Sequence, residues 1–139
     1  MVKKNKDVQF EISFYENVLG HAPDFIEVLV CLGDLYTKEG LYAKGLAIDE
    51  RLAALRPEEP VVMYNLACSY SLLNNIPCAR QAMLRAIDLG YDEWDHLQKD
   101  ADLVNLLGDS EFVARLNDRR SRAVGKRAHI LGPCQGESE

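Results

Sequence analysis

The sequence repeats itself with a period of 34 residues, and this repeat constrains the fold more than any other feature. Residues of like character coincide when the sequence is shifted by one period: Pro23 on Pro57, Leu32 on Leu66, Gly33 on Ala67 and Tyr36 on Tyr70. A period of this length is typical of a supersecondary unit that buries its apolar face against neighbouring copies. We therefore expect a stack of similar units rather than a conventional globular fold.

The apolar residues within each period follow the spacing of a helix. Leu29, Leu32, Gly33 and Tyr36 lie at positions i, i+3, i+4 and i+7, and the same spacing recurs one period later. The small residue in the middle of this face lets a neighbouring helix approach closely. Gly40 and the next period's Asn74-Asn75 suit the turns between paired helices.

These patterns predict one helical domain over residues 1–118. Its expected divisions are a half repeat at 8–23, a first repeat at 26–59, a second repeat at 60–93 and a C-terminal cap at 94–118. The expected helices pair 24–38 with 42–56 and 60–73 with 77–89, with a further helix at 8–20 and short helices after 92. We expect burial between helices for Leu32, Tyr36, Leu46, Leu66, Tyr70, Ala79 and Leu89.

The repeat resembles the tetratricopeptide repeat, whose unit carries W-x2-L-G-x2-Y…A-x3-F…P. The likeness covers about residues 8–91. Within this family, the sequence most resembles small bacterial-type proteins with about two and a half repeats. Both copies lack the tryptophan, and Tyr91 stands where a proline is usual. The resemblance implies an all-α fold of helix-turn-helix repeats stacked as an α-solenoid, closed by C-terminal capping helices.

Asp49 departs from the family pattern, which has a large aromatic residue at this position. Two interpretations remain open. In the first, the helix is slightly rotated and Asp49 reaches solvent or a nearby base such as Arg51. In the second, Asp49 is a buried functional carboxylate.

Charge is unevenly distributed along the chain, whose net charge is −6. Residues 7–118 are strongly acidic, whereas residues 1–6 and 119–139 are basic. We expect 119–139 to form a basic, flexible tail. An acidic body is poorly suited to a phosphate backbone, so nucleic-acid binding is disfavoured. A basic or neutral protein segment is a more suitable partner than an acidic one.

The sequence contains no recognisable catalytic or cofactor-binding motif. His21, His96 and His129 are isolated from one another, and the four cysteines have no zinc-ligand spacing. We therefore expect no enzyme, no cofactor and no metal site. No apolar run is long enough to cross a bilayer and the first residues do not form a secretory signal, so we expect a cytoplasmic protein with reduced cysteines.

In a stack of helix pairs, the first helix of each pair lines the concave face. We expect this face to bind a partner peptide or protein segment, in the manner of a scaffold or adaptor. The candidate contact residues are Glu27, Val30, Cys31, Asp34, Thr37, Lys38, Val61, Tyr64, Asn65, Cys68, Ser71 and Leu72. Tyr64 and Asn65 are the most informative of these candidates, and we expect both side chains to point away from the core.

A second hypothesis is self-association. The initial half repeat leaves an apolar helix face, formed by Phe10, Phe14 and Val18, without a partner helix of its own. Pairing of this face would produce a homodimer. Small secretion-type chaperones also hold about three such repeats, so a secretion-chaperone-like dimer is a variant of this hypothesis.

Overall fold

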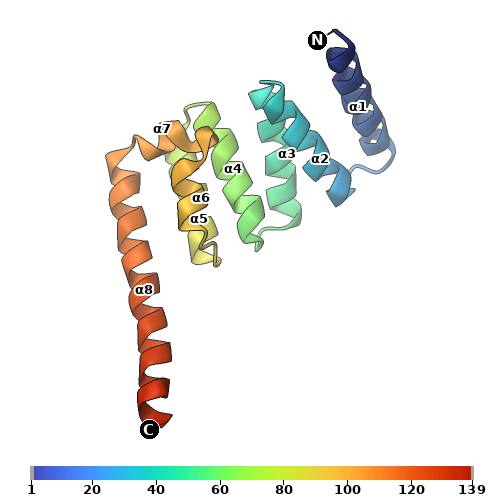
Figure 1. Ribbon diagram of the computed structural model, residues 1–139. Helices are drawn as coiled ribbons and strands as arrows, with labels where there is room; N and C mark the ends of the chain where they lie inside the picture. The colour runs from blue at the N-terminus through green and yellow to red at the C-terminus, as the bar shows by residue number, and fades with distance from the viewer. Residues whose placement is uncertain (1, 139) are drawn as a thin grey trace.

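The computed structural model describes the backbone of residues 2–138 and the side chains of residues 6–125. Its helices follow one another across the molecule in chain order, from α1 at one end to α8 at the other (Figure 1). They are α1 (Val2–His21), α2 (Ile26–Lys38), α3 (Tyr42–Leu55), α4 (Pro60–Leu72), α5 (Ile76–Asp88), α6 (Trp94–Lys99), the 3₁₀ helix η1 (Ala101–Leu103), α7 (Val104–Leu107) and α8 (Ser110–Ser138). No strand occurs between residues 2 and 138, and the predicted all-α stack of helix pairs is confirmed.

The turns within the two helix pairs depend on residues that tolerate a positive φ. Gly40, between α2 and α3, has a φ of 77°, and Asn74, between α4 and α5, has a φ of 59°. Glycine adopts this conformation without a steric penalty, and asparagine is among the residues that tolerate it. Asn75 then accepts a hydrogen bond from the Cys78 amide and caps α5. The predicted turn positions are therefore confirmed.

Small residues let the helices of each pair approach closely. A Cβ atom on Gly33 of α2 would lie 3.1 Å from Cγ2 of Ile48 on α3, and one on Gly45 would lie 3.0 Å from Oγ1 of Thr37. The equivalent positions one period later are Ala67 and Ala79, which are fully buried. The repeated small residue thus sets the spacing of the helices within each pair.

The cap after residue 91 closes the core of the second pair. Leu97, Leu103, Leu106 and Phe112 are fully buried, in the same apolar cluster as α4 and α5. Without the cap, the open end of the stack would expose this apolar surface to water. The expectation that short helices cover the end of the repeat is therefore confirmed.

Most residues predicted for the core are buried, and the others are only partly so. Leu32, Tyr36, Leu66 and Ala79 are buried, as predicted. Leu46, Tyr70 and Leu89 are only partly buried, so the prediction of burial between helices holds for them only in part. In particular, the Tyr70 hydroxyl reaches outward and donates a hydrogen bond to Glu50, 3.0 Å away at an exposed site.

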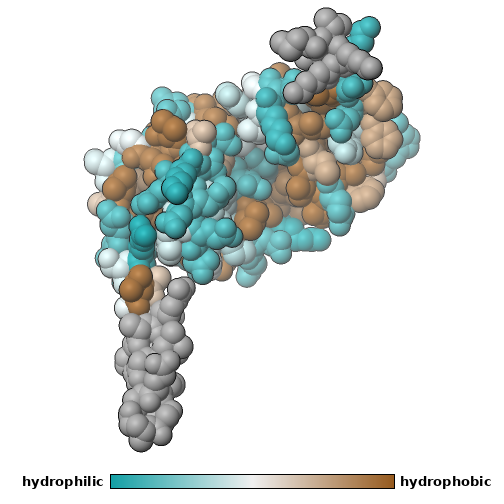
Figure 2. Space-filling view, in the orientation of Figure 1, coloured by the Kyte–Doolittle hydropathy of each residue, from teal (hydrophilic) through white to brown (hydrophobic). Residues whose placement is uncertain are grey.

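Helix α1 packs on the first pair with one face and presents the other to solvent. Ile12 and Leu19 are buried against the core of α2 and α3, and Val18 is partly buried in the same contact. The expectation that Val18 belongs to the free apolar face was therefore wrong. Phe10 and Phe14 point outward, with 72% and 53% of their surface exposed. Apolar side chains are visible at this end of the molecule in Figure 2.

Helix α8 extends away from the body of the protein and ends at Ser138 (Figure 1). The backbone is helical on both sides of the predicted boundary at residue 118, and Arg119 donates a 2.9 Å hydrogen bond to Asp88 on α5. The flexibility of the tail stays a prediction, and the side chains of Lys126 and Arg127 lie outside the described residues. Within the described part of the chain, no helix combines the length and apolar character needed to cross a membrane.

Candidate binding pocket

A pocket of about 370 Å³ opens on the face formed by α2 and α4, the first helices of the two pairs. Residues from α2, α3, α4 and the α6–η1 corner line it. Seven of the predicted contact residues are among them: Val30, Cys31, Asp34, Thr37, Tyr64, Asn65 and Cys68. The structure thus brings most of the predicted set together around one hollow, which we call the α2/α4 pocket. Their contact with a partner stays a prediction.

The other predicted contact residues lie outside the pocket lining. Glu27, Lys38 and Val61 are exposed, and Leu72 is partly buried. Ser71 is fully buried, and the expectation that it points away from the core was wrong. Its hydroxyl accepts a 3.1 Å hydrogen bond from the Leu106 amide. This contact fastens α4 to the cap.

Tyr64 differs from the exposed side chain that we expected. Only 5% of its surface is exposed, and its ring stacks on Tyr91 with 4.4 Å between the ring centroids. Its hydroxyl donates a 2.6 Å hydrogen bond to Asp100. Burial and this bond raise the pKa of Tyr64. Tyr64 therefore forms a wall of the pocket and part of the core, so the predicted orientation was wrong, whereas Asn65 is exposed as expected.

Asp49 is buried at the floor of the pocket, with 8% of its surface exposed. The interpretation that it faces solvent or Arg51 was wrong, since Arg51 instead donates a hydrogen bond to the Pro23 carbonyl. One carboxylate oxygen of Asp49 accepts a hydrogen bond from Ser69 on α4. The other has no hydrogen-bond partner among the described residues. Burial raises the pKa of Asp49 to about 6, and the Ser69 bond partly opposes this increase.

The α6–η1 corner supplies three further polar residues that the sequence reasoning did not select: His96, Asp100 and Asp102. Asp100 caps η1 by accepting a 3.0 Å hydrogen bond from the Asp102 amide. Nε2 of His96 lies 3.5 Å from the Asp100 carboxylate. Burial and the nearby Asp100 charge raise the pKa of Asp102. Asp100 and Asp102 lie in the segment 94–118 that was expected to form the cap, but nothing local indicated that they face α4.

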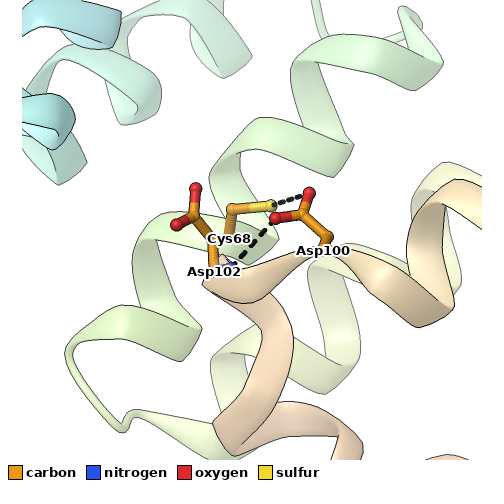
Figure 3. Close-up of side chains that lie close together, drawn as sticks. All are labelled: Cys68, Asp100 and Asp102. Carbon is orange, nitrogen blue, oxygen red and sulfur yellow. Dashed lines mark hydrogen bonds between the residues drawn. The ribbon is translucent and has the colours of Figure 1, made fainter.

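Cys68 lies between the two aspartates of this corner (Figure 3). Its thiol points to the Asp100 carboxylate at 3.9 Å, while the Asp102 carboxylate lies on the other side of the Cys68 side chain. Only 7% of Cys68 is exposed, so it forms a buried part of the pocket wall, and its contact with a partner stays a prediction. Burial and the neighbouring carboxylates raise the pKa of the Cys68 thiol, so the thiol stays protonated. A catalytic cysteine has the reverse property, a lowered pKa that favours the thiolate.

The same three side chains offer donor atoms that lie within 4.8 Å of one another. A thiolate and two carboxylates are ligands that a divalent metal ion accepts. However, the hydrogen bonds from Tyr64 and the Asp102 amide already account for the position of the Asp100 carboxylate. The expectation that the chain holds no metal site stays a prediction.

Negative charge dominates the described lining of the pocket. It contains four aspartates and neither lysine nor arginine, so that His96 is the one lining side chain that can carry a positive charge. At the rim, Asp34 forms a 2.9 Å ion pair with Lys38, and both side chains are more than half exposed. Such exposed pairs contribute little and are readily exchanged. The pocket is therefore an acidic hollow with a partly apolar wall.

Comparison with known proteins gives a partial relationship. No protein-family profile matches the chain. The chain is 31% identical over 80 residues to a chloroplastic protein of Arabidopsis thaliana that contains tetratricopeptide repeats. The aligned part is 55% of this chain but only 24% of that relative's length. The chain therefore has a distant likeness to one portion of a larger repeat protein.

Proposed function

We propose that this chain is a protein-interaction module that holds a segment of a partner protein across the α2/α4 pocket, and that it is not an enzyme. The proposal rests on the pocket itself. Residues of the first repeat, the second repeat and the cap all contribute to its lining. A hollow shared by successive helix pairs is how helical repeats present a binding surface. The distant likeness to a protein with tetratricopeptide repeats supports the same class of function.

The rim of the pocket offers the two kinds of contact that an extended segment needs. Val30, in the pocket lining, has 48% of its surface exposed, and Val61, one helical turn before Asn65 on α4, has 58% exposed, so that apolar side chains can be buried on binding. Asn65 is exposed between α2 and the α6–η1 corner, and its amide can pair with both groups of a peptide unit. These contacts favour a peptide or a loop of a partner over a small metabolite.

A basic or neutral segment is the proposed partner, since the lining is acidic. An acidic segment would bring its charge next to Asp34 and Asp102, and like charges across an interface are costly. The cytoplasmic location and the partner's identity stay predictions.

The experiment is to select binders from a phage-displayed library of random 12-residue peptides and to measure the affinity of synthetic copies. Asn65→Arg, at the exposed rim, should abolish binding because the long side chain fills the hollow. Gln81→Arg is the matched control, since Gln81 is also exposed but lies on α5, outside this pocket. Equal binding to both variants and the wild type would place the binding site elsewhere and defeat the proposal.

A second candidate function is self-association through α1. The observation that favours it is the outward direction of Phe10 and Phe14, which places two large aromatic side chains in water. Exposed apolar patches of this kind often mark interaction sites. The two functions do not exclude each other, because the α1 face and the α2/α4 pocket are formed by different residues.

A further inference from the structure

We propose that the α2/α4 pocket is a receptor for one cationic side chain, an arginine or a lysine, presented by the bound protein segment. This inference rests on the proposed function and specifies its partner chemistry. The strongest observation is the deep carboxylate of Asp49, which is more than nine-tenths buried and lines the pocket. One of its oxygens bonds to Ser69, and the other has no hydrogen-bond partner among the described residues.

The Asp49 carboxylate is largely removed from water and has no lysine or arginine beside it in the pocket lining, while its unpaired oxygen still reaches the open space of the pocket. Ionised groups are normally buried only when they are paired with an opposite charge or fully hydrogen-bonded. Within the described chain, Ser69 is the one side chain that bonds to Asp49, and it is neutral. A guanidinium or ammonium group that entered the pocket would supply the missing charge and donors for the free oxygen.

Further carboxylates line the same pocket from the α6–η1 corner. Asp102, at the start of η1, has no hydrogen bond to its carboxylate among the described residues and is only partly exposed. Asp100 adds a second charge but is engaged by Tyr64. Asp49 from α3 and Asp102 from the corner thus face one volume with no lysine or arginine between them. A planar guanidinium, with five donors, suits several separate acceptors better than a lysine ammonium does.

The pocket also has the shape and apolar surface for the stem of such a side chain. Its volume of about 370 Å³ is small among ligand pockets and suits a single side chain rather than a cofactor. Val30, Leu52 and the Tyr64 ring line it beside the carboxylates. Arginine and lysine place their methylene stems along apolar surface while the charged end meets polar groups.

The test uses one peptide selected as above, whose binding Asn65→Arg blocks, and a second version with its arginine or lysine replaced by glutamine. We expect the glutamine peptide to bind at least about tenfold more weakly. Asp102→Asn should weaken the basic peptide several-fold and leave the glutamine peptide unchanged. Glu58→Gln, at an exposed carboxylate outside both the pocket lining and the predicted contact residues, should change neither affinity. The same comparison of the two peptides is made with Asp49→Asn, at the buried carboxylate of the pocket, and circular dichroism checks that this variant is folded.

The failure of this inference differs from the failure of the proposed function. If Asn65→Arg blocks binding but the glutamine peptide binds as well as the basic one, the pocket holds a segment without a cationic anchor, and the inference is overturned. If Asn65→Arg has no effect, the proposed function itself fails. A third result would also overturn the inference: ZnCl₂ displaces the peptide from the wild type but not from Cys68→Ser, which would assign the pocket to a metal ion.

Discussion

The hydroxyl of Tyr64 donates a 2.6 Å hydrogen bond to the carboxylate of Asp100, 36 residues further along the chain. This bond joins α4, in the second repeat, to the corner of the cap, and both of its residues line the α2/α4 pocket. Asp100 is held at the same time by the Asp102 amide. The cap therefore completes the pocket wall, and these hydrogen bonds join the two.

Replacing Tyr64 by phenylalanine should destabilise the protein without changing its fold. The ring stacking on Tyr91 is kept, while the bond to a charged carboxylate is lost. Hydrogen bonds to charged groups contribute on the order of 1.5–3 kcal/mol. We expect a decrease of that size in the free energy of unfolding, measured by urea denaturation. Tyr70→Phe is the control, since its bond to Glu50 is exposed and its loss should cost less than about 1 kcal/mol. Equal losses in the two variants would contradict this prediction.

Ser71→Ala should loosen the cap. The Leu106 amide donates to the Ser71 hydroxyl in the protein interior, and alanine would leave that donor without a partner. An unsatisfied buried donor costs about 1–3 kcal/mol. We expect a stability loss in this range, together with faster amide hydrogen exchange at Leu106. Ser13→Ala, at an exposed site on α1, is the control and should change neither quantity. Normal exchange at Leu106 in Ser71→Ala would show that the contact does not hold the cap.

The repeat period could be predicted from sequence because it is a local property that recurs. Leu32, Gly33 and Tyr36 have counterparts one period later, and the same helix spacing follows from each copy. Gly40 marks a turn for the physical reason that it adopts a positive φ. The bounds of α2, α3, α4 and α5 were accordingly predicted to within two residues. In contrast, α1 begins at Val2 rather than at the predicted residue 8, and α8 continues past residue 118, because neither end of the chain carries the repeat.

The lining of the pocket was harder to predict because it depends on contacts between distant segments. The phase of α4 places Tyr64 on the first-helix face, but only the docking of Asp100 turns this face into an interior wall. The sequence left both a solvent-facing and a buried position open for Asp49, because a carboxylate stands there in place of the family's aromatic residue. Its burial follows from the close approach of Gly33 and from Ser69 on the next repeat. No local pattern encodes either relationship.

Asp49→Asn should stabilise the protein at neutral pH and have little effect in acid. Burial raises the pKa of Asp49 to about 6 from its ordinary value of 3.8. Between these values the folded state binds more protons than the unfolded state, so the contribution of Asp49 to stability falls as the pH rises through 6. The full penalty corresponds to roughly 1–3 kcal/mol, at about 1.4 kcal/mol for each pKa unit. Asparagine has no charge, so it should avoid this penalty.

The measurement is the free energy of unfolding in urea at pH 4.5 and pH 7.5, for the wild type and Asp49→Asn. The difference between them should be larger at pH 7.5. Asp24→Asn, in the exposed turn before α2, is the control and should show no such pH dependence. A stability gain that was equal at both pH values would contradict the pKa assignment. A gain at neutral pH combined with weaker binding of a basic peptide would mean that the buried charge is kept for binding at the expense of stability.

Asn65→Ala should weaken the binding of a selected peptide by on the order of 1–2 kcal/mol while leaving the free energy of unfolding almost unchanged. The side chain is exposed and lines the pocket, so its removal leaves no cavity in the core. In a complex its amide would bond to the partner's backbone, and the loss would leave a backbone group unpaired. Isothermal titration calorimetry and a parallel thermal melt measure the two quantities. An unchanged affinity would remove Asn65 from the binding site.

Self-association through α1 should be sensitive to charge on its outer face. If Phe10 and Phe14 pack against a second copy, light scattering should show a dimer, because pairing removes their exposed aromatic surface from water. Phe10→Asp or Phe14→Asp should convert the dimer to a monomer with little loss of folding stability, since both side chains point away from the core. Glu11→Lys, an exposed residue on the same helix, tests whether charge alone has an effect. A wild type that remains monomeric at the highest soluble concentration would end this hypothesis, and peptide binding at the α2/α4 pocket would be unaffected by that result.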